Sequence, residues 1–454
     1  MNGTAVIRFD EARCRVLEFV AERVIGAYNV DPIVVADLYG MMRLAVDDVA
    51  DTSEGIRQLR AQRDDVAMGF AQAAASYAPN SAGKGVLLFA SEMFAPVEVF
   101  GRTDVLTLSH GPRRVRWADN CVMGQTWLDL PARPSISPVG SKRVTFFGLK
   151  GGLGRSTAAT VWAMHLARQG RRVLVVDLDL ESPGLSSSLL PHERHPEYGV
   201  VDWFVEDPVH QADRELLVSM VERSPLAEGM KGELFVVPAG GRARSGYTYM
   251  PKLGRTYLTL THADAKVRRE HFAARLARFI DEIEQLDDLK PEVTILDSRA
   301  GLHDIAGVLV TDIGATSLLF AADTQQTWDG YGILFDNWRE HYERALRFRE
   351  DLHLVAAQVP EVDSVAYLKR FTNKAYRLFS DNLYEDAEGG ELDAFNYAED
   401  DETAPHAPLP IFWGRALQHF DPVHAADRVS MPQVDSLVEG FIERLDELVF
   451  QEKG

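Results

Sequence analysis

The sequence GLKGGLGRSTAA occupies residues 148–159, between an apolar run, VTFF at 144–147, and a stretch of helical spacing, TVWAMHLARQG at 160–170. A glycine-rich turn that joins a buried strand to a helix presents backbone N–H groups and the positive end of the helix dipole, and both attract phosphate. The stretch departs twice from the pattern G-x-x-x-x-G-K-[ST], since Leu149 replaces the first glycine and Arg155 replaces the lysine. It therefore predicts a nucleotide site with an unusual loop.

The segments around this loop alternate between strand and helix patterns. Apolar runs rich in Val, Ile and Leu, typical of strands buried on both faces, are separated by helical stretches such as 269–286 and 328–348. Such alternation predicts an α/β fold with a mostly parallel sheet flanked by crossover helices. The predicted strands lie at residues 142–149, 171–179, 232–240, 291–298, 315–324, 352–360 and 407–412.

A proline-rich segment separates this region from the beginning of the chain. The segment PARPSISPVGSK, residues 131–142, combines three prolines with small polar residues, as interdomain linkers do. The chain is long enough for two or three domains. We therefore expect a first domain at 1–130 and a second domain at 143–454.

The first domain contains two kinds of pattern. Its opening parts, 9–30 and 52–77, have apolar residues at helical spacing. The later runs, at 85–93, 96–109 and 113–130, are β-branched and aromatic with Gly and Pro between them, which predicts strands. The first domain is therefore expected to be a smaller α+β unit, and its sequence assigns it no role.

Charge and composition exclude several classes of protein. The net charge is -20, and residues 1–140 carry 14 Lys and Arg against 17 Asp and Glu, or -3, which leaves -17 for the rest. Such a field repels DNA phosphates unless a local basic patch overcomes it. The two cysteines, Cys14 and Cys121, stand alone and indicate no metal site.

The sequence also predicts a cytoplasmic protein that does not dock on a membrane. No window approaches eighteen uncharged apolar residues, and the beginning of the chain lacks the layout of a signal peptide. The amphipathic stretch at 434–454 is mostly acidic, so anionic lipid would repel it.

The glycine-rich loop resembles the deviant Walker A loop of the ParA/MinD family of P-loop ATPases, written K-G-G-x-G-K-[ST], and here it stands as KGGLGRS at 150–156. The resemblance implies that Lys150 reaches across an ATP-sandwiched homodimer to the partner's phosphates. It also implies that Ser156 is a Mg²⁺ ligand and that Thr157 contacts the inner phosphate. The nucleotide-binding residues implied in this way are Lys150, Gly151, Gly152, Leu153, Gly154, Arg155, Ser156, Thr157 and Gln358.

The resemblance continues downstream of the loop. The segment DLDLESPG at 177–184 is similar to the family's first switch, where Asp179 would orient the attacking water and Asp177 would support the metal. The strand ending in Asp297 matches the Walker B position, whose carboxylate holds Mg²⁺ through a water. The implied metal residues are therefore Ser156, Asp177 and Asp297, and the implied catalytic residues are Lys150, Arg155 and Asp179.

The motifs are closest to a subgroup with K-G-G-x-G-R-[ST], D-x-D-L-E-x-P-G and D-S-R-x-G, found in bacterial conflict and signalling proteins. The resemblance covers about residues 142–360, continues more thinly to 454, and implies an ATP-driven switch that controls a protein partner. Asp297 is followed by SRAG at 298–301, which stands at the position of the family's second switch but departs from its double-proline version, and Arg299 lies within it. Arg299 contacts phosphate, or it pairs with Glu181 or Asp304, and the sequence leaves these alternatives open.

Arg155 leaves the extent of hydrolysis open. An arginine keeps the positive charge, but its planar head cannot occupy the position of a lysine in a tight loop. Slow Mg²⁺-dependent ATP hydrolysis is expected. The alternatives are a nucleotide-gated scaffold without hydrolysis, an ATPase that partitions DNA or cargo, and a glycine-rich turn without a ligand.

Overall fold

The computed structural model describes residues 7–79, 85–102, 105–121, 123–128, 136–262, 268–385, 394–426 and 429–451. By its internal contacts the chain divides into two units, residues 1–132 and 133–454. Each unit buries its own apolar side chains. The division falls inside the proline-rich stretch 131–142, of which residues 131–135 lie outside the described residues.

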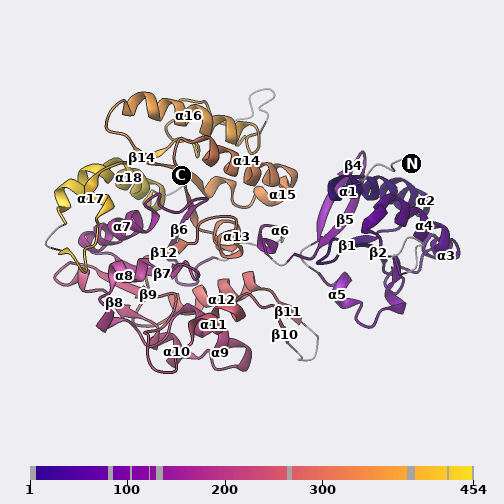
Figure 1. Ribbon diagram of the computed structural model, residues 1–454, viewed down its shortest axis with the longest axis horizontal. Coiled ribbons are helices and arrows are strands. Elements are labelled where there is room, and N and C mark those ends of the chain that lie inside the picture. The colour runs from indigo at the N-terminus through magenta and orange to yellow at the C-terminus, as the bar shows by residue number, and fades with distance from the viewer. Residues whose placement is uncertain are drawn as a thin grey trace, which may run out of the picture. The chain divides into compact units, whose positions relative to one another are not determined.

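An eight-stranded sheet runs through the second unit (Figure 1). Its strands are β6 (Lys142–Gly148), β7 (Arg172–Leu178), β8 (Glu222–Arg223), β9 (Glu233–Val237), β12 (Val293–Ser298), β13 (Thr316–Ala321), β14 (Leu352–Val359) and β15 (Leu409–Phe412). Their order is β15-β14-β13-β6-β12-β7-β9-β8. All neighbours pair in parallel except β8 with β9. The predicted mostly parallel sheet is confirmed.

The alternation of side chains along β7 explains why this sheet is buried on both faces. Val173 and Val175 belong to the apolar cluster on one face. Leu174, Val176 and Leu178 belong to the cluster on the other face. Successive strand residues point to opposite faces, so a continuous apolar run supplies both clusters.

Helices cover both faces of the sheet. One cluster joins the sheet to α7 (Arg155–Gln169) and α18 (Met431–Phe450), and the other joins it to α9 (Val200–Glu206), α12 (Phe272–Glu284) and α13 (Asp304–Thr311). The other elements of this unit are α8 (Leu185–Leu189), α10 (Arg214–Ser219), α11 (Tyr249–Thr256), β10 (Leu260–His262), β11 (Arg268–Glu270), α14 (Gln325–Glu340), α15 (Tyr342–Ala345), α16 (Ser364–Ser380) and α17 (Arg415–Gln418). No helix among the described residues is both long and apolar enough to span a bilayer.

The first unit is a smaller α+β structure, as predicted. Its helices are α1 (Phe9–Phe19), which continues through a π-helical turn into α2 (Gly26–Tyr28), then α3 (Glu54–Ala61) and α4 (Arg63–Ala74). Its strands are β1 (Ile33–Ala36), β2 (Met42–Val46), β3 (Leu87–Phe89), β4 (Leu106–His110) and β5 (Arg113–Asp119). They form a mixed sheet in the order β3-β2-β1-β5-β4.

Two predictions for the first unit were wrong. The run PVEVF was expected to be a strand, but Val97–Phe100 forms the short helix α5, and Gln125–Leu128 forms the short helix α6. Pro96 precedes α5 with helical dihedral angles, and none of the four α5 side chains is buried. Apolar residues that stay partly exposed after a proline with helical dihedral angles are compatible with a short helix, so their residue types alone did not decide for a strand.

Candidate functional site

The glycine-rich loop lies between the end of β6 and the beginning of α7. Gly152 and Gly154 have φ angles of 78° and 81°, in the left-handed region that favours glycine. A Cβ atom added to Gly151, Gly152 or Gly154 would meet no atom within 4 Å, so the outer side of the loop is open. α7 begins at Arg155 and directs the unpaired N–H groups of its first turn toward the loop. This arrangement is suited to bind phosphate.

Ser156, in the first turn of α7, and Asp297, near the end of β12, are in direct contact next to the loop. Ser156 Oγ donates a hydrogen bond of 2.7 Å to Asp297 Oδ2. Asp297 is 1% exposed, and its other oxygen, Oδ1, is buried without a hydrogen-bond partner. Burial raises the pKa of Asp297 to about 7, and the nearby Asp177 adds to the rise while Arg155 opposes it. An unsatisfied buried carboxylate oxygen indicates a cation or a water that the site is built to bind.

The donor atoms at this position fit Mg²⁺. A serine hydroxyl and a carboxylate are the hard oxygen ligands that Mg²⁺ prefers, and phosphate oxygens and waters normally complete its octahedron. Within the described residues, no group of three or more His, Cys, Asp or Glu side chains is arranged to hold a metal on its own. The site therefore suits a metal that arrives together with a phosphorylated ligand.

Asp177 lies beside Asp297 but makes different contacts. The two residues are register partners on the neighbouring strands β7 and β12. Asp177 Oδ2 accepts hydrogen bonds from Ser186 N at 3.1 Å and Ser186 Oγ at 3.0 Å, and Oδ1 accepts one from Asp179 N at 3.3 Å. Oδ2 thus holds the end of β7 to Ser186 in α8, and Oδ1 fixes the turn at Asp179. Residues 177–184, which are similar to the family's first switch by motif, are called the first switch segment below.

Asp179 lies in the first switch segment and faces Arg155. Its Oδ2 is 4.0 Å from Arg155 Nη2, and its Oδ1 accepts a hydrogen bond of 3.2 Å from Ser182 N. Burial raises the pKa of Asp179 to about 6, although the charge of Arg155 acts in the opposite direction. Asp179 is therefore mostly ionised at neutral pH and able to accept a hydrogen bond from water.

Arg155 connects the two switch segments. Its side chain is 8% exposed, and its Nη1 donates a hydrogen bond to the carbonyl of Ser298, the last residue of β12. We call residues 298–303, which begin with the stretch SRAG and end before α13, the second switch segment. Its Cδ lies close to Gly148, where an added Cβ would meet it at 3.2 Å. The guanidinium thus lies across the carboxyl ends of β6 and β12, which the position of Arg155 in the loop motif does not reveal.

Lys150 contacts its own chain. Its Nζ donates a hydrogen bond to Oε1 of Gln326, in the first turn of α14. Lys150 is partly exposed, so the ammonium is accessible from outside the loop. The role across a dimer that the resemblance implies requires Lys150 to leave Gln326.

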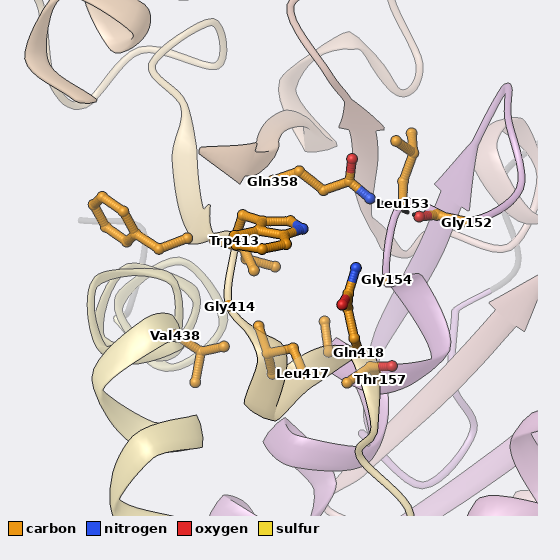
Figure 2. A pocket seen from close by; sticks show the side chains of 13 residues that line it. Gly152, Leu153, Gly154, Thr157, Gln358, Trp413, Gly414, Leu417, Gln418 and Val438 are labelled. Atoms are coloured by element: carbon orange, nitrogen blue, oxygen red, sulfur yellow. Dashed lines mark hydrogen bonds between the residues drawn. The ribbon is translucent and has the colours of Figure 1, made fainter. Parts of the chain in front are cut away.

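A cavity of about 320 Å³ adjoins the loop (Figure 2). The structure places Thr157 and Gln358 in its lining, and Gln358 Nε2 donates a hydrogen bond of 2.8 Å to the Gly152 carbonyl. Gln358 has a φ angle of 58° at a register shift of β14, a strained conformation that is often found at functional sites. The lining residues are Gly152, Leu153, Gly154, Thr157, Ala158, Gln358, Ile411, Phe412, Trp413, Gly414, Leu417, Gln418 and Val438.

Trp413 is a lining residue that the sequence analysis did not find. It follows β15 and is 43% exposed, and Figure 2 shows it with Gln358 beside the glycine loop. A large aromatic ring that stays exposed next to a polar amide suits a planar heterocycle. The tryptophan next to a predicted strand was visible in the sequence, but nothing there placed β15 beside the loop.

Arg299 pairs with Glu181. Its Nη1 lies 3.1 Å from Glu181 Oε2. Of the alternatives that the sequence left open for Arg299, the structure shows the pairing with Glu181.

A family profile matches the middle of the chain. Residues 144–352 match the CobQ/CobB/MinD/ParA nucleotide binding domain. The match spans less than half of the chain. It covers neither the first unit nor the residues after 352. No curated protein sequence matches the chain.

Three structures illustrate the similarity to known proteins. A ParA family ATPase from Chlorobium tepidum TLS is 14% identical, with 67% of this chain and 99% of that chain covered and a TM-score of 0.40. A plasmid partition protein from Borrelia burgdorferi B31 bound to AMPPNP is 12% identical, covering 67% and 98%, with a TM-score of 0.41. An ATP complex of a McdA variant from Cyanothece is 13% identical, covering 69% and 98%, with a TM-score of 0.40. Sequence identities and TM-scores as low as these assign no function to the chain.

Proposed function

We propose that the chain is a Mg²⁺-dependent ATP-binding switch that hydrolyses ATP slowly, dimerises on ATP and controls a protein partner. The observation that carries this proposal is the pair Ser156 and Asp297, with an unsatisfied buried oxygen, below an open glycine loop. The profile match over residues 144–352 supports nucleotide binding. The resemblance of the motifs to proteins of bacterial defence and signalling supports the switch role.

Each residue of the site has a proposed task. Ser156 and, through a water, Asp297 would hold Mg²⁺, which would neutralise charge on the triphosphate. The N–H groups of Gly151–Gly154 would bind phosphate oxygens, and Thr157 would donate to the inner phosphate. The cavity beside Gln358 and Trp413 would take the base. The carboxylate of Asp179 would accept a hydrogen bond from the attacking water and so orient it.

Calorimetry tests nucleotide binding. Titrating the full chain with ATP, ADP and GTP, with Mg²⁺ and with EDTA in its place, should give Mg²⁺-dependent binding of ATP. Ser156→Ala removes a metal ligand and should weaken the Mg²⁺-dependent part, leaving any binding in EDTA unchanged. If none of these nucleotides binds the folded chain, the proposal is wrong.

Measurements of molecular mass test the switch. ATP with Mg²⁺ should convert the chain from a monomer to a dimer, and ADP should not, because the proposed interface includes the γ-phosphate. Dimers that form equally with both nucleotides would contradict the proposal that hydrolysis resets the state.

The second candidate function is a nucleotide-gated scaffold without hydrolysis. It is favoured by the contacts of Arg155, whose guanidinium is engaged with the Ser298 carbonyl and faces Asp179. A guanidinium group held by these contacts is not free to stabilise the negative charge that develops on the transferred phosphoryl group. The scaffold requires ATP-induced dimers without phosphate release.

The variant Arg155→Lys separates the two candidates. A lysine presents a single point charge and cannot make both of the contacts of Arg155. We expect wild-type protein to release phosphate slowly and Arg155→Lys to release it about tenfold faster, since about one charge-assisted hydrogen bond is redirected to the phosphate. Dimers without phosphate release in both proteins would favour the scaffold.

DNA partitioning is the remaining alternative. The charge of -20 opposes it. DNA binding that appears with ATP and disappears at moderate salt would support partitioning instead of a protein partner.

A further inference from the structure

Three consecutive residues of the first switch segment are tied to three different parts of the second unit. Asp179 faces Arg155 of the loop at 4.0 Å. The carbonyl of Leu180 accepts a hydrogen bond of 2.6 Å from Tyr249 OH, at the beginning of α11. Glu181 then contacts both the residue after α11 and the second switch segment.

Glu181 is the centre of a cluster that we call the Glu181 clamp, which consists of Glu181, Tyr257, Arg299 and His303. Glu181 Oε1 accepts a hydrogen bond of 2.5 Å from Tyr257 OH and lies 3.2 Å from His303 Nε2, and Oε2 lies 3.1 Å from Arg299 Nη1. The side chains of Glu181, His303 and Arg299 are 18%, 11% and 35% exposed. One carboxylate thus joins three segments that are distant in sequence.

The clamp is anchored on the side of α11 by aromatic packing. The ring of Tyr257 lies 4.9 Å from the ring of Phe272 in α12 and 5.2 Å from the ring of His303, measured between centroids. Tyr257 therefore cannot follow Glu181 without disturbing α12 and the second switch segment. Because packed groups have discrete arrangements, a shift of Glu181 would move α11 or break the clamp.

The position of the clamp connects it with the proposed site. Glu181 lies two residues after Asp179, and Arg299 follows Ser298, whose carbonyl accepts from Arg155. The two switch segments are thus joined twice, by Arg155 at the loop and by Glu181 on the side of α11. A rearrangement of either segment around a phosphate changes the distances at Glu181.

We propose that Glu181 is a positioning residue, which fixes Asp179 relative to the second switch segment and transmits the nucleotide state to residues 249–257. The inference rests on the proposed function, because it needs a nucleotide at the loop. Residues 249–257 are then the segment whose conformation reports the nucleotide state to the rest of the protein.

The variant Glu181→Gln tests the proposal. The amide oxygen still accepts from Tyr257, but the charge that holds Arg299 and His303 is lost. The measurements are the affinity for Mg²⁺ and AMPPNP, the single-turnover rate of phosphate release, and hydrogen exchange of residues 249–257 with and without AMPPNP. We expect an affinity within about twofold of wild type. The rate should fall about tenfold, as for the loss of a partly exposed charge-assisted contact.

Hydrogen exchange is the readout that a purely structural role would not change. In wild-type protein AMPPNP should alter exchange of residues 249–257, and in Glu181→Gln this response should be lost while exchange without nucleotide stays close to wild type. Arg299→Lys, which alters the clamp from the other side, should behave in the same way. A response retained in both variants overturns the proposal.

Glu228→Gln is the matched control, because it removes the same charge at an exposed position. Glu228 pairs with Arg194 at 2.7 Å, and its described contacts include neither switch segment nor residues 249–257. It should leave affinity, rate and the exchange response unchanged, whereas a loss equal to that in Glu181→Gln would overturn the proposal. If wild-type protein binds no AMPPNP, the proposed function fails and the clamp fails with it. If wild type binds and responds but Glu181→Gln does the same, the clamp alone fails.

Discussion

Arg155 illustrates how one side chain changes the chemistry of a loop. A lysine at this position carries one compact charge, whereas the guanidinium presents donors in two directions within one plane. Arg155 donates to the Ser298 carbonyl with Nη1, and its Nη2 lies 4.0 Å from the carboxylate of Asp179. The residue that the motif assigns to phosphate is therefore also a link between the switch segments.

Replacing Lys150 tests the residue that the resemblance names as the signature of the loop. Lys150→Ala should reduce steady-state phosphate release by about a hundredfold or more, because a positive charge at the transition state is lost. Nucleotide affinity should change much less, since Ser156 and the glycine N–H groups remain. Lys142→Ala, an exposed lysine at the other end of β6, is the control. Phosphate release unchanged in Lys150→Ala would remove Lys150 from the mechanism.

The carboxylates predict a pH dependence of metal binding. Burial raises the pKa of Asp297 to about 7 and the pKa of Asp179 to about 6. Only the ionised forms attract Mg²⁺, so Mg²⁺-dependent nucleotide affinity should fall below pH 7, by up to about tenfold per pH unit for each proton taken up. Calorimetry between about pH 8 and about pH 5.5 measures this fall. Affinity in EDTA should vary less, and a flat profile with Mg²⁺ would contradict the assignment of Asp297.

In the nucleotide-free protein, the same two carboxylates affect stability in the opposite direction: their contribution to the free energy of unfolding falls as pH rises. The pKa of each is raised in the folded state, so at pH values between the unfolded and folded pKa the folded chain binds more protons than the unfolded chain. Their contribution to stability is therefore greatest at low pH in this range and decreases as pH rises through about 6 and 7. The sign follows from the direction of the shift.

Among the elements, α7 carries the loop and is held by the last helix of the second unit. Asp446 of α18 accepts hydrogen bonds from Trp162 Nε1 at 2.8 Å and contacts His165 Nε2 at 3.0 Å. Burial tends to raise the pKa of Asp446, but the contacts with His165 and Trp162 outweigh it and the pKa is lowered. The carboxylate thus links α7, which follows the glycine-rich loop, to α18, the last described helix of the second unit.

Removing this carboxylate should destabilise the second unit. Asp446→Ala leaves the indole N–H of the buried Trp162 without a partner and should lower the free energy of unfolding by ~2 kcal/mol. Urea denaturation measures the loss. Glu447→Ala, at an exposed position of the same helix, should change stability by less than about 0.5 kcal/mol. Equal effects of the two variants would show that the contact with α7 contributes little.

At the scale of the whole molecule, the chain is two units with separate cores. The apolar cluster of the first unit shares no residue with the two clusters of the second. All residues assigned to the nucleotide site lie in the second unit. The proposed binding function therefore does not require residues of the first unit for its ligands.

A fragment of residues 136–454 should fold alone and bind Mg²⁺ and ATP with the affinity of the full chain, within about twofold. The physical reason is that its core and its site are complete without residues 1–132. Calorimetry on both proteins makes the comparison. Scanning calorimetry of the full chain should resolve two thermal transitions, one of which the fragment reproduces. A fragment that does not fold would mean that the units stabilise each other.

The elements that could be predicted are those whose residues carry the information locally. The apolar run of β7 has partners on both faces in any parallel sheet, and Gly152 and Gly154 are needed wherever a loop takes left-handed dihedral angles. Short apolar runs were ambiguous, as PVEVF was, and β1 and β2 were not singled out because each is only a few residues long.

Ser156, Asp177 and Asp297 stand in motifs, so a shared site could be predicted from residue type and order along the chain, and their metal role stays a prediction. Strand order places Asp297 beside Asp177, and packing decides that Arg155 contacts Ser298, that Lys150 contacts Gln326, and that Trp413 joins the cavity. These contacts connect segments that lie far apart in the sequence, such as Lys150 and Gln326. The direction of a polar side chain depends on which donors and acceptors from other segments lie within about 3 Å of it. The sequence around the residue does not determine which segments these are.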